Sequence, residues 1–386
     1  MTGERMHWRN LIAACAAVSV FSFSLGEMYP LLALKMESWG TSKDWIGYNS
    51  AMSPIGVMLA GLVISRLAHR FGAKRVALTM TAATGCVLML YPVFPTLAAW
   101  FALRFLQGGF VATLFALSEA WVVRFAHGRY RARVTSIYAA VIAASFGLGA
   151  AVLGVTGIEG HLPFLIGAAV MFAAMPLIAL VEDDGAELEE EGHMSFFAFA
   201  PKAPLLLVAI LAHSIFDGAM IGFMPVYAVA HGFSLGLAAL TVTALAFGNF
   251  FFQLPIGWIA DHVAKRKVIL ACFIICLIGM GILPWLMQSL WLWLLLPVVG
   301  AANFAIYSVG LATLGDEFSG AELVAGTTAF SSVWGLGALL GSLISGYAMA
   351  WFGAEAYPIA MMLVCAAYFL AHFALKFAQM RRAKAS

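Results

Sequence analysis

The chain has 386 residues, of which 63% are hydrophobic and only 10% are charged. A soluble globular domain is about 45–50% apolar and about 25% charged, so composition excludes a water-soluble fold for most of this chain. The net charge of +2 is uninformative as a total, because in a membrane protein the distribution of charge carries the information. We expect lipid as the surrounding medium and no nucleic-acid partner.

Long apolar runs follow one another from Leu11 to the end of the chain. A helix needs about 20 apolar residues to cross a bilayer. The first run is too long for a cleavable signal sequence and lacks a small-residue cleavage site. The continuous runs also exclude a β-barrel, whose strands alternate. We therefore predict an all-α membrane protein with twelve transmembrane helices, near 9–35, 45–67, 75–94, 97–123, 134–158, 162–181, 204–230, 235–260, 267–287, 290–313, 326–351 and 356–377.

Positive charge predicts the orientation of these spans. Cytoplasmic loops are enriched in Lys and Arg. With both termini in the cytoplasm, nearly all of the 21 Lys and Arg residues fall on the inner side. The exceptions are Lys35, Lys43 and Arg104. We predict a multi-pass protein of the bacterial inner membrane with both termini cytoplasmic.

The longest polar stretch divides the chain into six spans and six spans. Residues 182–203 carry an acidic run that includes Glu187 to Glu191. Like charges repel and keep such a segment extended, so we interpret it as a solvated cytoplasmic linker. The predicted domains are an N-terminal six-helix bundle, 1–181, the linker, 182–203, and a C-terminal six-helix bundle, 204–386.

A basic hairpin motif occurs once in each predicted bundle, between two spans. From His69 to Asp261 the offset is 192 residues, and the same offset aligns glycines elsewhere in the chain. Two six-helix halves with parallel repeats are a recurring transporter plan. The two copies are Ser65-x-x-x-His69-Arg70-x-Gly72-x-Lys74-Arg75 and Gly257-x-x-x-Asp261-His262-x-Ala264-Lys265-Arg266-Lys267.

The same offset aligns a stripe of small residues in the fifth and eleventh spans. Gly149 and Gly154 belong to the first stripe, and Gly337, Gly341 and Gly346 to the second. Small residues let helix backbones approach closely where lipid supplies no hydrophobic drive. We predict close helix packing along both stripes.

Four ionisable residues fall inside predicted spans, where charges are costly and mark pathways or pairs. Glu27 and Arg104 both lie roughly 10–12 Å below the outer surface at 1.5 Å per residue, so an ion pair between them is predicted if their spans are neighbours. The alternatives are a role in transport and a static buried pair. Glu119 lies near the inner surface, where it is expected to meet the basic cluster as part of a gate or a structural pair.

Asp217 lies near the midplane of the seventh span, and no Lys or Arg is available in the C-terminal spans to pair with it. We expect it to titrate during transport or to bind a cationic substrate. The alternative is a permanently protonated acid bonded to the backbone or to His213. Gln107, His213 and Asn303 are further candidates for the substrate cavity, if they converge.

These motifs resemble the major facilitator superfamily over nearly the whole chain. The basic hairpins are similar to that family's signature loop, Gly-x-x-x-Asp-Arg-x-Gly-Arg-Lys, and Arg104-x-x-Gln107-Gly108-Gly109 to its Arg-x-x-Gln-Gly motif. Gly149-Ala150 departs from the Gly-Pro pair of drug antiporters. The segment Ser118-Glu119-Ala120-Trp121 is similar to the YcaD-like branch. The resemblance implies two pseudo-symmetric six-helix bundles of the major facilitator fold.

The resemblance also implies a gating role for the inner hairpins. In that family the loop Asp bridges helices and holds one end of the transporter closed. Asp261 matches this residue, with Lys265 and Arg266 beside it. In the first copy His69 stands in its place, before Arg70 and Gly72, so we predict a weaker latch there. The alternative is that the basic residues only set the topology.

We predict a secondary active transporter that moves a small organic solute by alternating access, coupled to protons. No phosphate-binding loop occurs in the sequence, so ATP is not expected. The alternatives are a receptor or assembly protein on a transporter scaffold and an intramembrane enzyme. We disfavour the enzyme because no clustered nucleophile or metal spacing occurs. The five cysteines lie in apolar runs, which favours packing over a metal site. We expect no cofactor and a monomer.

Overall fold

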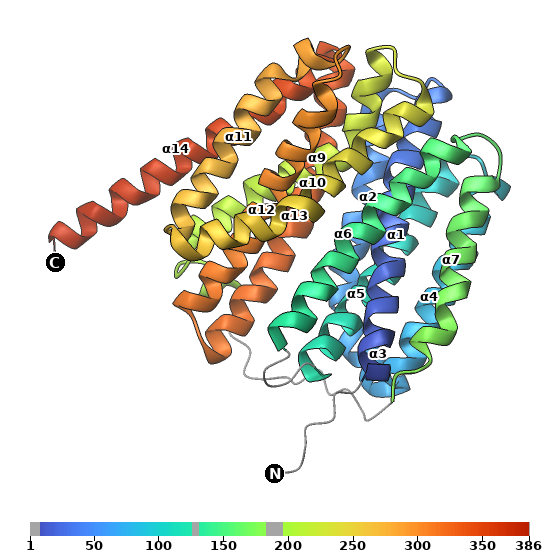
Figure 1. Ribbon diagram of the computed structural model, residues 1–386, viewed down its shortest axis with the longest axis horizontal. Coiled ribbons are helices and arrows are strands. Elements are labelled where there is room, and N and C mark those ends of the chain that lie inside the picture. Colours follow the sequence, from blue (N-terminus) through green and yellow to red (C-terminus); the bar gives the residue numbers. More distant parts are fainter. Residues whose placement is uncertain (1–7, 126–130, 183–195, 386) are drawn as a thin grey trace. The chain divides into compact units, whose positions relative to one another are not determined.

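The computed structural model describes residues 8–125, 131–182 and 196–385, and all regular structure in these ranges is α-helical. Figure 1 labels most of the helices. Their bounds are α1 Trp8–Ser38, α2 Lys43–Gly61, α3 Ile64–Phe71, α4 Ala73–Val93, α5 Leu97–Phe125, α6 Arg131–Thr156, α7 Leu162–Ile178, α8 Phe196–Phe199, α9 Pro204–Ala230, α10 Leu235–His262, α11 Lys265–Leu286, α12 Leu292–Glu317, α13 Gly320–Phe352 and α14 Ala356–Ala385.

Ten of the described helices are long and apolar enough to cross a membrane. The pair α2 and α3 forms an eleventh candidate span, bent by 54° at Leu62 and Val63. The apolar helix α7 has 17 residues and occupies the place of the sixth predicted span. The predicted fold class is confirmed. The prediction of an unbroken second span is wrong, because the apolar run continues through a break in the helix.

Two inner connections differ from the sequence prediction. The connection between the predicted spans 290–313 and 326–351 is mostly helical, because α12 continues to Glu317 and α13 begins at Gly320. The short helix α8 lies within the predicted linker, and Glu182 at the linker's start accepts a hydrogen bond from Arg9 at 3.5 Å. The acidic run Glu187 to Glu191 lies outside the described residues.

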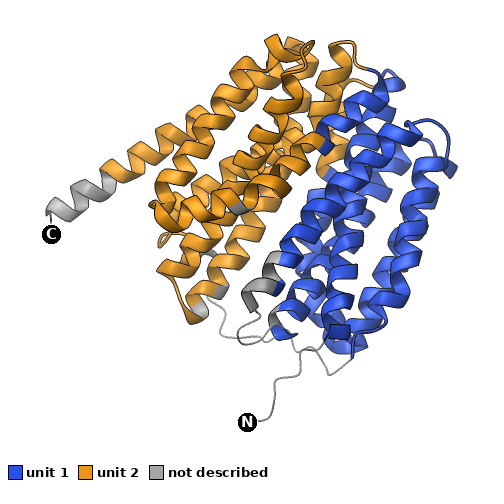
Figure 2. Cartoon of the chain, in the orientation of Figure 1, with its two compact units in different colours: residues 1–40, 52–190, 234–243 blue, residues 41–51, 191–233, 244–386 orange. Residues whose placement is uncertain are grey.

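The helices group into two compact units, shown in two colours in Figure 2. Unit 1 comprises residues 1–40, 52–190 and 234–243, and unit 2 comprises residues 41–51, 191–233 and 244–386. In unit 1, α1 packs against α5, α6 and α7, and α4 packs against α5 and α7. In unit 2, α9 packs against α12, α13 and α14, and α11 against α12 and α14.

Glycines bring one helix pair of each unit into backbone contact. In unit 1, a Cβ on Gly149 of α6 would lie 2.3 Å from the Phe23 carbonyl oxygen of α1. In unit 2, a Cβ on Gly341 of α13 would lie 2.0 Å from the Ile215 carbonyl oxygen of α9. Real Cβ atoms do not approach an oxygen this closely, so each site requires glycine. The two contacts are related by the 192-residue offset.

The other glycines of the two stripes also lie at close helix contacts. A Cβ on Gly337 would meet the Ser214 Cβ at 2.4 Å, and one on Gly346 would meet the Lys43 carbonyl oxygen at 2.7 Å. A Cβ on Gly154 would meet the Leu240 side chain at 2.6 Å. Small residues thus set the helix spacing along both stripes.

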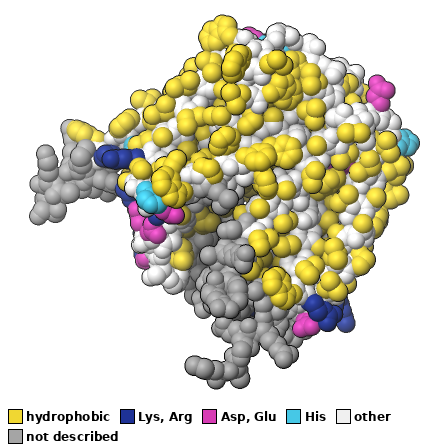
Figure 3. Space-filling view, in the orientation of Figure 1, with side chains coloured by type: hydrophobic (Ala, Val, Ile, Leu, Met, Phe, Trp, Pro, Cys, Tyr) yellow, Lys and Arg dark blue, Asp and Glu magenta, His cyan; other side chains and the backbone are white. Residues whose placement is uncertain are grey.

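Apolar side chains cover most of the face seen in Figure 3, and charged side chains appear in small groups at its margins. Large exposed apolar residues include Val155, Trp285 and Leu370. An exposed apolar surface of this extent is costly in water but not in lipid. The surface therefore suits a membrane-embedded protein.

Candidate functional site

Asp217 is buried in the middle of α9, and each of its carboxylate oxygens accepts a hydrogen bond from another helix. Asn303 of α12 donates from Nδ2 to Oδ1 at 3.3 Å, and Trp334 of α13 donates from Nε1 to Oδ2 at 3.3 Å. Both donors are neutral, and Asp217 forms no ion pair with a described side chain. A carboxylate group thus lies inside unit 2 with neutral partners only.

His213 extends this cluster by one helical turn. Its Nδ1 lies 3.0 Å from Asn303 Oδ1, and both residues are buried. An amide oxygen only accepts, so His213 Nδ1 carries a proton in this arrangement. The Asn303 amide thereby links the imidazole to the Asp217 carboxylate. Three sequence-predicted residues come together here, whereas Trp334 was not predicted, because a tryptophan in an apolar span carries no specific signal.

Gln107 holds a second buried polar cluster, in unit 1. Its Nε2 donates to Ser24 Oγ of α1 at 2.8 Å, and its Oε1 accepts from the Tyr91 hydroxyl of α4 at 2.9 Å. Trp100 Nε1 donates to the Tyr91 carbonyl at 3.1 Å. Gln107 therefore connects α1, α4 and α5, and both ends of its amide have partners.

The predicted ion pair between Glu27 and Arg104 does not form. Arg104 is buried, with its guanidinium carbon 4.5 Å from the centre of the Tyr29 ring. Neither carboxylate oxygen of Glu27 has a hydrogen-bond partner among the described residues. Residues two apart on a helix point to different faces, so Tyr29 faces Arg104 and Glu27 does not. The prediction placed the two charges at one depth but not on one face.

Glu27 instead points between α1, α4 and α7. It is fully buried, and a Cβ on Gly167 of α7 would lie 2.2 Å from its Oε2 and 3.1 Å from Leu88 of α4. The missing side chain at Gly167 makes the room for this carboxyl group. Unit 1 thus contains a buried acid in an apolar setting, separate from the Gln107 cluster.

The first basic hairpin lies between α3 and α4. Gly72 joins the two helices with φ of 85°, a backbone conformation that side chains disfavour. His69 and Arg70 are exposed, and His69 forms no hydrogen bond or ion pair with a described residue. The hairpin is tied to its own unit by Lys74, whose Nζ donates to the Val181 carbonyl at 3.0 Å.

The second basic hairpin is tied by ion pairs to the end of α12. Lys265 Nζ lies 2.6 Å from Asp316 Oδ2, and Arg266 Nη2 lies 2.8 Å from Glu317 Oε1. Asp261 is exposed and forms no hydrogen bond or ion pair with a described residue. Within unit 2 the acids that hold the hairpin are therefore Asp316 and Glu317. These two acids were not among the predicted site residues.

Glu119 does not meet a basic side chain in the described part of the chain. It is exposed on α5, while its neighbour Ser118 shares a 2.7 Å hydrogen bond with the Tyr138 hydroxyl. Much of the inner basic cluster between Arg124 and Arg133 lies outside the described residues, so the expected contact of Glu119 with it stays a prediction.

Comparison with known proteins decides the family. The sequence model of the family described as Major Facilitator Superfamily matches residues 12–247 and 205–385. The chain belongs to this family. A superfamily member is an integral multi-pass membrane protein and a transporter, and this chain is accordingly not an enzyme.

Relatives and solved structures agree with this assignment. The chain is 24% identical over 359 residues to the uncharacterized MFS-type transporter YfkF of Bacillus subtilis, covering 90% of this chain and 89% of YfkF. It is 25% identical over 299 residues to YcaD of Shigella flexneri, covering 76% of each. The nucleoside transporter NupG has the same fold, with a TM-score of 0.77 at 16% identity, covering 95% and 98% of the two chains. A bacterial homolog of the lysosomal transporter Spinster has a TM-score of 0.75 at 15% identity, covering 95% and 97%.

The two ion pairs of the second hairpin predict a measurable coupling in this facilitator. Reversing either Lys265 or Asp316 places like charges together, and reversing both restores the pair. Solvent screens exposed pairs, so we expect a small coupling that stabilises the folded protein when both charges are reversed together. A double-mutant cycle of thermal unfolding in detergent measures it. The coupling should shrink in 1 M salt, and additive effects of the two reversals would contradict the pairing.

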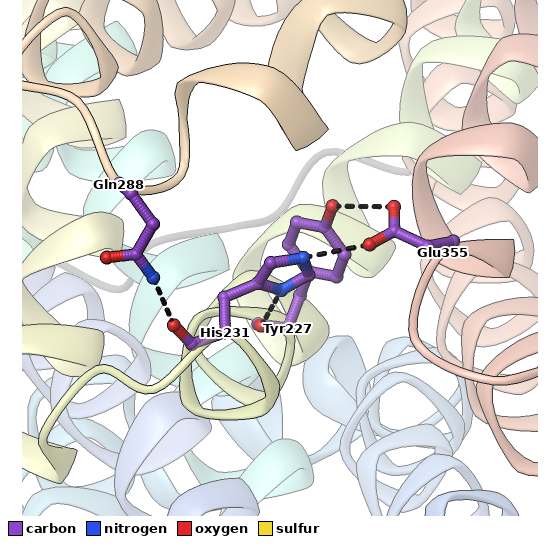
Figure 4. A network of polar contacts seen from close by, with 4 residues as sticks. All are labelled: Tyr227, His231, Gln288 and Glu355. Carbon is purple, nitrogen blue, oxygen red and sulfur yellow. Dashed lines mark hydrogen bonds and ion pairs between the residues drawn. The ribbon is translucent and has the colours of Figure 1, made fainter.

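A further polar cluster in unit 2 was not predicted, and Figure 4 shows it. His231 Nε2 lies 2.8 Å from Glu355 Oε1, and the Tyr227 hydroxyl donates to Glu355 Oε2 at 3.1 Å. His231 Nδ1 lies 2.9 Å from the Tyr227 carbonyl, and Gln288 donates to the His231 carbonyl. The two ring nitrogens thus face two oxygen atoms, the Tyr227 carbonyl and the Glu355 carboxylate. The cluster joins α9 to the α11–α12 and α13–α14 connections.

Glu355 accepts from both His231 and Tyr227, so its removal should lower the stability of the protein more than the loss of one donor does. We expect Glu355→Ala to lower stability by about 1–2 kcal/mol and Tyr227→Phe by about 0.5–1 kcal/mol. Thermal unfolding of both variants and of the double variant tests this order. The double variant should resemble Glu355→Ala, and a larger effect of Tyr227→Phe would contradict the assignment.

Proposed function

We propose that this protein is a secondary active transporter that moves a small organic solute by alternating access and couples the movement to protons. The observation that carries the proposal is Asp217, a buried carboxyl group with neutral partners on two other helices. An uncompensated charge in a membrane-embedded bundle is costly. Such a group is neutralised by a proton or by a bound cation, and exchange between the two is the coupling step.

The hydrogen bonds that Asp217 accepts link its protonation to the packing of other helices. Protonation of Asp217 removes an acceptor from Asn303 or from Trp334, which lie on α12 and α13. The donor that loses its acceptor is left without a partner inside the protein, which costs about 1–3 kcal/mol unless its helix moves or solute takes the place. The proton on Asp217 thereby biases the position of α12 or of α13.

Glu27 is the second proton-carrying candidate, in unit 1. Its carboxylate oxygens are buried and have no hydrogen-bond partner among the described residues, which favours the protonated form unless a helix moves. Arg104 acts as a fixed cation that Tyr29 orients. Gln107 is the further polar residue that we assign to solute binding in unit 1, and His213 is the one that we assign to it in unit 2.

The two basic hairpins lie on the cytoplasmic side in this proposal, with both termini cytoplasmic and the protein in the bacterial inner membrane as a monomer. Asp261 is the latch of the second hairpin, and His69 stands at the matching place of the first. The ion pairs of Lys265 and Arg266 hold the second hairpin in position for that role.

Purified protein in proteoliposomes tests the proposal. A panel of organic cations, nucleosides and other small solutes is first screened by thermal shift, and stabilising compounds are then followed in flux assays with and without a pH gradient. We expect uptake or extrusion that depends on the gradient. Ligand stabilisation without any flux would instead support a receptor on a transporter scaffold.

A further inference from the structure

The first half of α13 exposes a polar face. Within the span the hydroxyls of Thr328, Ser331 and Ser332 are exposed, and Thr327 is half-buried. By contrast, the large exposed side chains of α14 from Ile359 to Phe373 are apolar, namely Ile359, Leu363, Leu370 and Phe373. Helix faces that meet lipid are apolar, and polar faces of spanning helices turn to protein or to water. The exposed face of α13 therefore suits water, and that of α14 suits lipid.

Ser331 and Ser332 present hydrogen-bond acceptors on this face. Ser331 Oγ donates its proton to the Thr327 carbonyl at 3.2 Å, and Ser332 Oγ to the Thr328 carbonyl at 2.9 Å. With the hydrogens used inside the helix, the oxygen lone pairs face outward. Such a surface stabilises water, hydronium and ammonium groups, which donate hydrogen bonds, and not anions.

This hydroxyl face, which consists of Thr327, Thr328, Ser331 and Ser332, leads to Asp217. Trp334 follows Ser331 by three residues, so the two are neighbours on the helix surface. Trp334 is half-buried, and its indole N–H donates to Oδ2 of the buried Asp217. Thr327 and Trp334 lie about 10 Å and about 21 Å along the axis from the start of α13. From the start of α13 inward, an entering ion therefore meets first the hydroxyls, then the Trp334 indole and then the Asp217 carboxylate of α9.

Three cations near the starting end of this face have acid partners, which weakens their repulsion of an entering positive charge. Lys202 pairs with Glu322 beside the start of α13, Lys265 with Asp316, and Arg266 with Glu317. Among the described residues, the buried acid to which this face leads is Asp217.

We propose that the hydroxyl face of α13, residues Thr327, Thr328, Ser331 and Ser332, lines an aqueous route to Asp217 that admits cations, and that the Trp334 indole closes its deep end. The cations are hydronium or protonated amines. This inference rests on the proposed function only in taking Asp217 as the coupling acid. It makes Trp334 a positioning residue, which acts through Asp217.

Thiol labelling tests the route without any transport assay. In a background with the exposed Cys86 replaced by Ser, we compare Ser331→Cys and Ser332→Cys with the control Leu363→Cys on α14. Membrane-impermeant methanethiosulfonate reagents should modify both α13 variants and leave Leu363→Cys unmodified in lipid vesicles. Size-exclusion profiles confirm that each variant is folded. If neither α13 cysteine reacts faster than Leu363→Cys, the aqueous route is wrong.

Two additional comparisons test the cation preference and the closing role. The rate ratio of a trimethylammonium reagent to a sulfonate reagent should be at least about tenfold higher for Ser331→Cys than for a small free thiol in solution, and Asp217→Asn should remove this excess. Asp217→Cys should react about tenfold faster when Trp334→Ala is added. A ratio equal to that of the free thiol, or equal rates with and without Trp334→Ala, would overturn that part of the inference. Labelling as expected with no solute flux would leave the route standing while the proposed function fails.

Discussion

Asp217→Asn is expected to abolish proton-driven accumulation of solute while solute exchange down its own gradient continues. Asn is close in size to Asp and still accepts a hydrogen bond, but it cannot gain and lose a proton. A gradient of two pH units supplies about 2.7 kcal/mol per proton, which supports a concentration ratio of up to about 100 with one coupled proton. In Asp217→Asn this ratio should fall to about 1.

Flux in proteoliposomes, with internal solute measured at steady state, checks this result. Glu159→Gln is the control, because Glu159 is an exposed carboxylate in another part of the chain. It should accumulate solute as the unaltered protein does. Full accumulation by Asp217→Asn would remove Asp217 from the coupling step and leave Glu27 as the acid to test.

Gly341→Ala is expected to destabilise the protein more than any other single methyl addition in the α9–α13 contact. The added Cβ would lie 2.0 Å from the Ile215 carbonyl oxygen, and backbone cannot rotate away as a side chain can. The two helices must separate, which also disturbs the hydrogen bond from Trp334 to Asp217. Overpacking in a core costs about 1–3 kcal/mol, and we expect the upper end of this range or loss of folded protein.

Gly257→Ala is the matched control, because nothing lies within 4 Å of the Cβ position at this helical glycine. Alanine stabilises a helix by about 0.5–1 kcal/mol relative to glycine, so this variant should melt at the same temperature or higher. Melting temperatures in detergent compare the two. A Gly341→Ala protein as stable as the parent would mean that α9 and α13 are not in backbone contact.

The spans could be predicted from the sequence because each needs an apolar run of nearly fixed length. The ends of α4, α5 and α9 lie within two residues of the prediction for this reason. The break between α2 and α3 could not be predicted, because Leu62 and Val63 continue the apolar run. Hydropathy indicates whether a segment suits an apolar environment, and it does not indicate whether the helix is continuous.

The cluster at Asp217 was partly predictable, because the sequence reveals its single polar residues but not the contacts between them. A polar residue in an apolar span stands out, so His213, Asn303 and Asp217 were identified one by one. Which of them meet depends on helix rotation, and that follows from tertiary packing. The same limit explains the wrong pairing of Glu27 with Arg104, since depth along a helix does not define its facing side.

The cluster of Tyr227, His231, Gln288 and Glu355 carries no sequence signal of its own. His231 and Glu355 are 124 residues apart, at the ends of different helices. Residues in connections follow no period, so only the fold brings them together. The two basic hairpins show the opposite case, because their spacing repeats at the offset that relates the two halves.

Proton movement driven by solute is the most direct test of proton-coupled transport. Proteoliposomes in weak buffer, with no initial pH gradient, are given a stabilising solute on one side, and the pH of both sides is followed. We predict a solute-induced pH change that requires the protein and is absent in Asp217→Asn. Solute flux at the full rate with no pH change on either side would contradict the account.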